Sequence, residues 1–135
     1  MGLYHRRHTW NMENLWINLY MMIFYTNRFI TANAAACARG PFIFIRPEYK
    51  GDKGLLAHEK VHVRQAWRGL FIVHAFCYLL SDRYKLECEV EAYKEQAKHY
   101  ADDHLPLFAR FIAERYGLRI STDEALKLLR QESSR

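Results

Sequence analysis

The chain has 135 residues, half of them hydrophobic and 26% charged, with a formal net charge of +5 when His is counted as neutral. This length is typical of one domain that buries a core without disulfide staples, and the composition excludes an intrinsically disordered chain. Much of the positive excess lies near the two ends of the chain. No basic stripe is interleaved with aromatic side chains, so we expect no specific nucleic-acid binding.

The three cysteines, Cys37, Cys77 and Cys88, are odd in number and show no CxxC spacing. This pattern argues against a disulfide framework and favours a reducing compartment, so we predict a cytoplasmic protein. A basic start at 5–8 and an apolar run at 15–25 loosely mimic a signal peptide, but polar residues interrupt the pattern. No segment reaches the roughly 18 apolar residues that a bilayer requires, so no transmembrane span is expected.

In chain order, the first expected element is an apolar, aromatic-rich helix over residues 11–26. Residues 28–36 form either a strand or the end of that helix. Arg39-Gly40-Pro41 is a turn signal, and the β-branched and aromatic run Phe42–Ile45 predicts a strand. Such a strand is either a paired core strand or an edge strand that aligns an extended peptide.

The second half of the chain is predicted to be helical. Asp52 is the expected N-cap of a helix that runs to about Gly69, and the apolar run 70–80 predicts a buried helix. Further helices are expected over the ranges 83–100 and 105–116, and the capping box Ser121-Thr122-Asp123-Glu124 opens a last one. We therefore expect an α+β fold, mainly α, in a single domain over 1–135 with its core at about 42–100.

His58, Glu59 and His62 form an HExxH motif within an apolar stretch of the expected helix that Asp52 caps. Residues i and i+4 share one face of a helix, so both imidazoles can bind one metal ion. Glu59 occupies the position at which metalloproteases carry their general base, acting on zinc-bound water. The alternative is a charged helix face without metal, but a buried helix needs a partner for these polar groups.

Glu89 is the best candidate for the third zinc ligand. The residues Leu86, Val90, Tyr93, Ala97 and Tyr100 recur at helical spacing and predict a stripe that faces the core. At about 100° per residue, Glu89 lies at the edge of this stripe, whereas Glu87 and Glu91 point to solvent. The alternatives are that Glu89 pairs with Lys85 at i−4, or that His74 is the ligand.

HExxH followed by Glu89-Val90-Glu91-Ala92-Tyr93 on a second helix resembles the gluzincin class of zinc metallopeptidases. More narrowly, it resembles small zincin-like domains of bacteria and phages. The resemblance covers roughly residues 42–96 and implies a minimal zincin-like fold, with Glu89 as third ligand from the first acid of a Glu-x-x-Ala motif. Several membrane-bound relatives have an aspartate after the alanine, where this chain has Tyr93.

We therefore predict a zinc metallopeptidase that takes a peptide or protein substrate. One Zn²⁺ is held by His58, His62 and Glu89, and Glu59 is the base. A further hydrogen-bond donor is needed for the tetrahedral intermediate, and its candidates are Tyr93, His74, His99, Tyr100 and His104. The alternatives are a catalytically degenerate, zinc-binding zincin-like interaction module and a basic, metal-free protein that binds nucleic acid or an anionic surface. The oligomeric state stays open.

Overall fold

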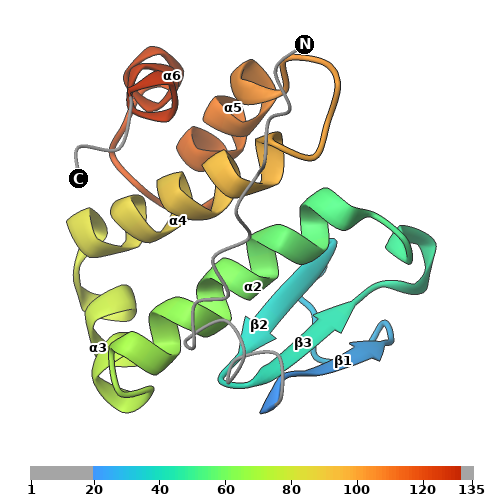
Figure 1. Ribbon diagram of the computed structural model, residues 1–135. Coiled ribbons are helices and arrows are strands. Elements are labelled where there is room, and N and C mark those ends of the chain that lie inside the picture. The colour runs from blue at the N-terminus through green and yellow to red at the C-terminus, as the bar shows by residue number, and fades with distance from the viewer. Residues whose placement is uncertain (1–19, 132–135) are drawn as a thin grey trace, which may run out of the picture.

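The computed structural model describes residues 20–131 (Figure 1). Three short strands, β1 (Met22–Tyr25), β2 (Ala36–Arg39) and β3 (Phe42–Ile45), form a sheet in the order β1-β3-β2. β1 pairs with β3 in parallel, and β2 pairs with β3 antiparallel. The 3₁₀ helix η1 (Pro47–Tyr49) then leads into the helical part. Among the described residues, no helix is long and apolar enough to cross a membrane.

Five helices follow in the described chain, and they stack away from the sheet. They are α2 (Lys53–Arg68), α3 (Ile72–Leu80), α4 (Asp82–Ala97), α5 (Leu105–Arg115) and α6 (Thr122–Arg130). Figure 1 shows the sheet against α2, α4 alongside α2, and α5 and α6 beyond α4. The predicted α+β, mainly helical class is confirmed.

Two apolar cores hold these layers together. The first joins the sheet to α2 through Ile43, Ile45 and Val63, each at most 2% exposed. The second joins α4, α5 and α6 around Phe108 and Ile112. The predicted stripe of α4 packs into the second core, with all five of its residues in or against the cluster (Leu86, Val90, Tyr93, Ala97 and Tyr100). The α2–α4 contact is thus the seam between the two cores.

The local signals at helix starts are confirmed. The Asp52 carboxylate accepts a hydrogen bond of 2.9 Å from the Leu55 N–H and caps α2. Ser121 and Glu124 form the predicted capping box of α6. These interactions satisfy N–H groups that a helix leaves unpaired at its first turn, which explains why α2 and α6 begin where the sequence indicates.

The first expected helix is wrong over its last part, although Tyr20 is helical. Met22–Tyr25 is a strand, and residues 11–19 lie outside the described chain. An apolar run of this kind suits a strand as well as a helix, and pairing with β3 decided between them. The range 28–36 forms neither a strand nor a helix until β2 begins at Ala36.

The strand Phe42–Ile45 is confirmed, and it is the paired alternative that holds. β3 is the central strand, with a neighbour on each side, so it is not the edge strand. Gly40, at a φ of 60°, makes the turn that brings β2 back to β3, and its lack of a side chain suits this left-handed backbone. β2 is therefore the edge strand next to α2.

The helix expected over 70–80 exists as α3, but the expectation that it is buried is wrong. No residue of α3 is buried, and Ile72, Phe76, Leu79 and Leu80 are 62–79% exposed. The composition of an element predicts burial only when enough of the remaining chain is available to cover it. Within residues 20–131, α2 and α4 contact only part of α3.

Candidate metal centre

The two histidines of the motif come from the middle of α2 and point toward α4. His58 is 5% exposed, and its Nε2 lies 3.0 Å from the Nε2 of His62. Spacing at i and i+4 on a regular helix explains this approach. Both rings thus present the same nitrogen to a common point.

Glu89 reaches that point from α4. Its carboxylate lies 3.6 Å from His58 Nε2 through Oε2 and 3.5 Å from His62 Nε2 through Oε1. The three residues each offer one ligand atom, and these atoms lie within 4.8 Å of one another. The structure therefore brings together the three residues that were predicted as ligands.

The charges in this cluster are strongly coupled. Burial on its own would raise the pKa of Glu89, but the charge and hydrogen bond of His62 outweigh burial and lower it to about 2. Burial on its own would lower the pKa of His62, but Glu89 outweighs burial and raises it to about 9. Without metal, a protonated His62 thus balances the buried carboxylate of Glu89.

His58 behaves in the opposite way. Burial, and then the charge of His62, lower its pKa to about 3, so its ring is neutral at physiological pH. A neutral imidazole is the form that binds a metal. His58 thus needs no deprotonation before it acts as a ligand.

The donor set fits a zinc ion. Ligand atoms about 2.0–2.1 Å from zinc in a tetrahedron lie roughly 3.3–3.4 Å apart. His58 Nε2 lies 3.0 Å from His62 Nε2 and 3.6 Å from Glu89 Oε2, both close to that value, and the three ligand atoms lie within 4.8 Å of one another. Glu89 Oε2 is buried and has no hydrogen-bond partner among the described residues, which a cation would supply. Two imidazoles and a carboxylate are also a donor set typical of catalytic zinc.

Glu59 lies beside the cluster, where α2 faces β2. It is 4% exposed, and its carboxylate accepts a hydrogen bond from the backbone of Ala38. Burial is the main reason that its pKa rises to about 7. Its Oε2 is buried without a hydrogen-bond partner in the described chain. One carboxylate oxygen is thus held by the strand and the other is free to take a proton.

Gln65 supports His62, and its role was missed from the sequence. Its Oε1 lies 2.9 Å from His62 Nδ1, and its Nε2 donates to the Cys88 carbonyl at 3.1 Å and to Glu91 at 2.8 Å. This amide fixes the ring orientation and leaves Nε2 free for the metal. The spacing of three residues on one helix was a readable signal, because i and i+3 side chains meet.

Tyr78 is a second missed residue. Its hydroxyl donates to Glu89 Oε1 at 2.5 Å from the other side of the cluster. Burial, together with the charge of Glu89, raises its pKa far above the ordinary value, so it keeps its proton. Tyr78 lies on α3, and no sequence pattern places that helix against the site.

The alternatives for the third ligand do not hold. His74 Nδ1 lies 2.9 Å from the Tyr84 hydroxyl and is outside the metal-ligand group. Lys85 reaches the carbonyl of Tyr116 at 3.5 Å, and Glu89 is 1% exposed rather than on a solvated flank. Glu87 and Glu91 are exposed, as predicted, and Glu91 pairs with Arg64 at 3.0 Å (both glutamates are on α4).

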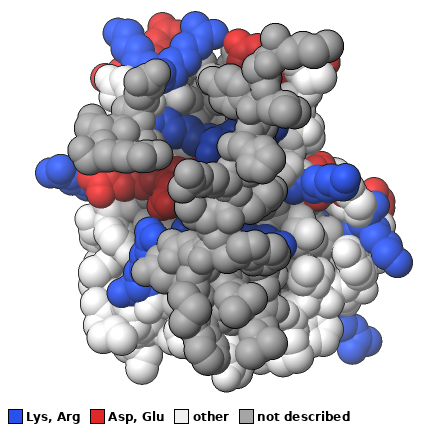
Figure 2. All heavy atoms as spheres, in the orientation of Figure 1, with Lys and Arg blue, Asp and Glu red and all other residues white. Residues whose placement is uncertain are grey.

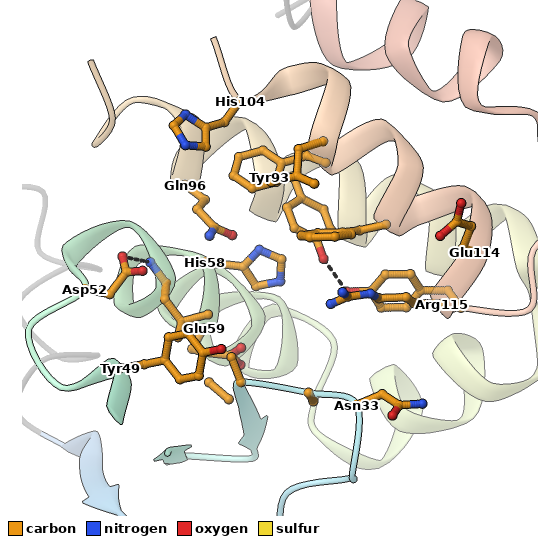
Figure 3. A pocket seen from close by; sticks show the side chains of 18 of the residues that line it. Asn33, Tyr49, Asp52, His58, Glu59, Tyr93, Gln96, His104, Glu114 and Arg115 are labelled. Carbon is orange, nitrogen blue, oxygen red and sulfur yellow. Dashed lines mark hydrogen bonds between the residues drawn. The ribbon is translucent and has the colours of Figure 1, made fainter. Parts of the chain in front are cut away.

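The candidate donors for the tetrahedral intermediate lie in different places. Tyr93 packs edge-on against His58, with ring centroids 4.4 Å apart, and its hydroxyl bonds that of Tyr116 at 2.9 Å. Tyr100 donates to Asp52 at 2.8 Å, and His99 is exposed. Figure 3 shows His58, Glu59, Tyr93 and His104 around one pocket, with His104 at its rim.

Comparison of the chain with models of protein families, with curated proteins and with solved structures found no match. The relationship to gluzincins therefore stays a prediction that rests on the motif residues.

Proposed function

We propose that the protein is a zinc-dependent peptidase. One observation carries the proposal: a buried glutamate with one unpartnered oxygen lies beside three converging metal-ligand side chains. A metal site with a purely structural role would need only the three metal-binding side chains. The free carboxylate of Glu59 adds a proton acceptor at the place where a hydrolytic water would be activated.

His58, His62 and Glu89 would hold the ion. When bound, Zn²⁺ supplies Lewis acidity, which polarises a carbonyl and makes water more acidic. Glu59 accepts the proton of the attacking water and returns it to the leaving amine, and a pKa of about 7 suits both transfers near neutral pH. Gln65 and Tyr78 act as positioning residues for His62 and Glu89.

The edge strand supports a peptide as the substrate class. Among the described strands, β2 has a neighbour only on its β3 side. Its other side borders α2 and the three candidate metal ligands, His58, His62 and Glu89, which we call the ligand cluster. An extended peptide can pair with such an edge, which holds its backbone in register beside Glu59. The expected location is a reducing compartment such as the cytoplasm, because Cys37, Cys77 and Cys88 are all free thiols.

The test compares wild type, Glu59→Gln and Glu89→Ala after equal loading with zinc. Wild type is expected to bind about one zinc ion per chain and to cleave members of a peptide library. Glu59→Gln is expected to keep its zinc and lose at least about 100-fold in kcat/KM. Glu89→Ala is expected to lose the zinc, whereas the control Glu87→Ala, on the exposed side of α4, retains both zinc and activity.

Two results would count against this function. If wild type and Glu59→Gln bind zinc equally and neither cleaves any peptide, the site is that of a zinc-stabilised binding module. If wild type takes up no zinc, the metal centre itself is refuted.

A further inference from the structure

Two clefts meet at the ligand cluster, with volumes of about 600 and 720 Å³. Their shared lining comes from the loop before β2, from the start of β2, from α2 and from the residue after α5 (Thr31, Ala34, Ala36, His58, Glu59 and Tyr116). The two clefts are therefore the two arms of one groove, and Glu59 lies where they join. We name them the α5 arm and the α3 arm after the helices that line them.

The α5 arm carries charged and polar side chains beside apolar ones such as Leu107 and Phe111, so it is more polar than the α3 arm. Figure 3 shows side chains of both charges around it, including Asp52 from the start of α2 and Glu114 and Arg115 from the end of α5. Gln96 and His104 add further polar groups. This arm suits polar or charged parts of a ligand.

The α3 arm is mostly apolar beyond the ligand cluster. Phe71, Ala75 and Leu79 line it from the α3 side, and Ala38 and Gly40 line it from β2 and its turn. Leu79 is 73% exposed although it borders the site. The part of Figure 2 at the lower left, where α3 lies in Figure 1, shows few charged atoms. Exposed apolar side chains that continue into a site mark a place where apolar groups bind.

A turn with unusual backbone angles sets the position of the α3 arm. Leu70 and Phe71 have φ values of 51° and 40°, in the left-handed region that β-carbon-bearing residues avoid. This turn places α3 across the end of α2 and sets the Phe71 ring 4.8 Å from that of Trp67. Strained residues of this kind cluster at binding sites, where they hold side chains in working positions.

The edge strand sets the direction of a bound peptide. The Arg46 N–H donates to the Ala35 carbonyl, and backbone groups alternate along a strand, so those of Ala36 and Ala38 point away from β3. The Ala38 N–H is bonded to Glu59, which leaves the Ala36 N–H and the carbonyls of Ala36 and Ala38 to pair with a peptide. Antiparallel pairing is the more stable mode. A peptide paired antiparallel to β2 has its N-terminal part over Ala38 and Gly40, in the α3 arm, and its C-terminal part in the α5 arm.

We propose that the α3 arm binds a large apolar side chain of the substrate, on the N-terminal side of the bond that is cut, and that the α5 arm binds polar or charged residues after it. The inference rests on the proposed function for the identity of the ligand as a substrate. It names the substrate class as extended peptides with an apolar-to-polar boundary at the cleavage site.

Leu79 and Leu80 provide a matched pair for the test. Both are exposed on α3, at 73% and 79%, but only Leu79 lines the groove. Zinc-loaded wild type, Leu79→Asp and Leu80→Asp are assayed on two peptides that differ only in Leu or Ser before the cut. We expect wild type to prefer the Leu peptide, and Leu79→Asp to lose about 10-fold in kcat/KM on that peptide alone. Leu80→Asp is expected to match wild type.

Binding to zinc-loaded Glu59→Gln separates this inference from the proposed function, because it needs no turnover. Tighter binding of the Leu peptide, weakened by Leu79→Asp in the same background, supports the groove assignment even if wild type cleaves nothing. Cleavage without a preference for the apolar residue, or with that preference after the cut, leaves the peptidase in place and overturns the inference. Equal binding of both peptides overturns it as well.

The same variants distinguish other occupants of the exposed helix. Sedimentation with anionic lipid vesicles, or dimer formation, that Leu79→Asp and Leu80→Asp reduce equally would assign this face to a bilayer or to a second copy. Combined with equal cleavage of both peptides, either result overturns the substrate assignment.

Discussion

At the scale of single residues, the environment gives three carboxylates of one region three different properties. Glu59 is buried beside a strand, and its pKa rises to about 7. Glu89 is as deeply buried, but the neighbouring His62 holds its pKa near 2. Glu91 is exposed and pairs with Arg64. The roles that we propose for these residues, as base, metal ligand and outer support, depend on these surroundings, since the side chains themselves are identical.

Gln65→Ala is expected to weaken zinc binding by about 10- to 100-fold, because His62 loses the partner that orients its ring. Competition with a chromophoric zinc chelator measures this change. Lys60→Ala, on the same helix, is the control and should bind zinc as wild type does. Equal affinity of Gln65→Ala and wild type would show that the His62 ring is held without this amide.

Zinc affinity is expected to increase with pH up to about 9. The pKa of His62 in the metal-free protein is about 9, so below that pH a proton occupies the ring and must leave before the metal binds. Competition by one proton changes the apparent affinity roughly tenfold per pH unit. Calorimetry at pH 7.5 in buffers of different ionisation enthalpy should find about one proton released. No release would mean that His62 is already neutral.

At the scale of elements, hydrogen bonds connect the N-cap of α2 to the segment that follows α4. The Tyr100 hydroxyl donates to the Asp52 cap at 2.8 Å and accepts from Gln96 at 3.1 Å. Gly54 makes room for this ring, because a Cβ there would lie 2.5 Å from Tyr100 Cζ. The helix that carries the histidines is thus positioned against the helix that carries Glu89.

Gly54→Ala is expected to destabilise the fold by about 1–3 kcal/mol, because the added methyl displaces a packed ring. This cost exceeds the gain of up to about 1 kcal/mol that alanine brings to a helix. Urea denaturation measures the difference. In a Tyr100→Ala background the clash is absent, so the same substitution should be neutral or stabilising. Destabilisation in both backgrounds would assign the effect to the helix backbone instead.

At the scale of the whole molecule, the ligand cluster lies on the seam between the two apolar cores. His58 and His62 belong to the helix that packs on the sheet, and Glu89 to the helix that packs on α5 and α6. One ion would therefore join two halves that otherwise meet mainly through the α2–α4 contact. A bound ligand stabilises the folded state by mass action.

Zinc is therefore expected to raise the free energy of unfolding by about 4 kcal/mol at a free concentration a thousand times its Kd. Urea unfolding with buffered zinc and with EDTA measures the difference. Glu89→Ala should lose the increment, and Glu87→Ala should retain it. If zinc leaves wild-type unfolding unchanged, the cluster does not bind the ion in the folded protein.

Predictions succeeded where the interacting residues are close together in the sequence, and failed where the outcome depends on distant parts of the chain. The cap of α2, the capping box of α6 and the stripe of α4 depend on residues within a few positions of each other, and all three were readable. The sequence predicts a helix where β1 lies, because an apolar run without a clear period fits either element. Pairing with β3, which is distant in the chain, decides for the strand. The exposure of α3 was missed because burial depends on what the rest of the chain covers.

The sequence by itself determined the α+β, mainly helical class and the three residues that meet as a candidate metal site. Helical spacing alone places His58 beside His62 and Glu89 at the edge of a core-facing stripe. Tertiary structure alone decided that β2 is the edge strand beside α2, that Tyr78 contacts Glu89 and that an apolar arm borders the site. Those features join segments far apart in the chain, and their contacts depend on how whole elements pack.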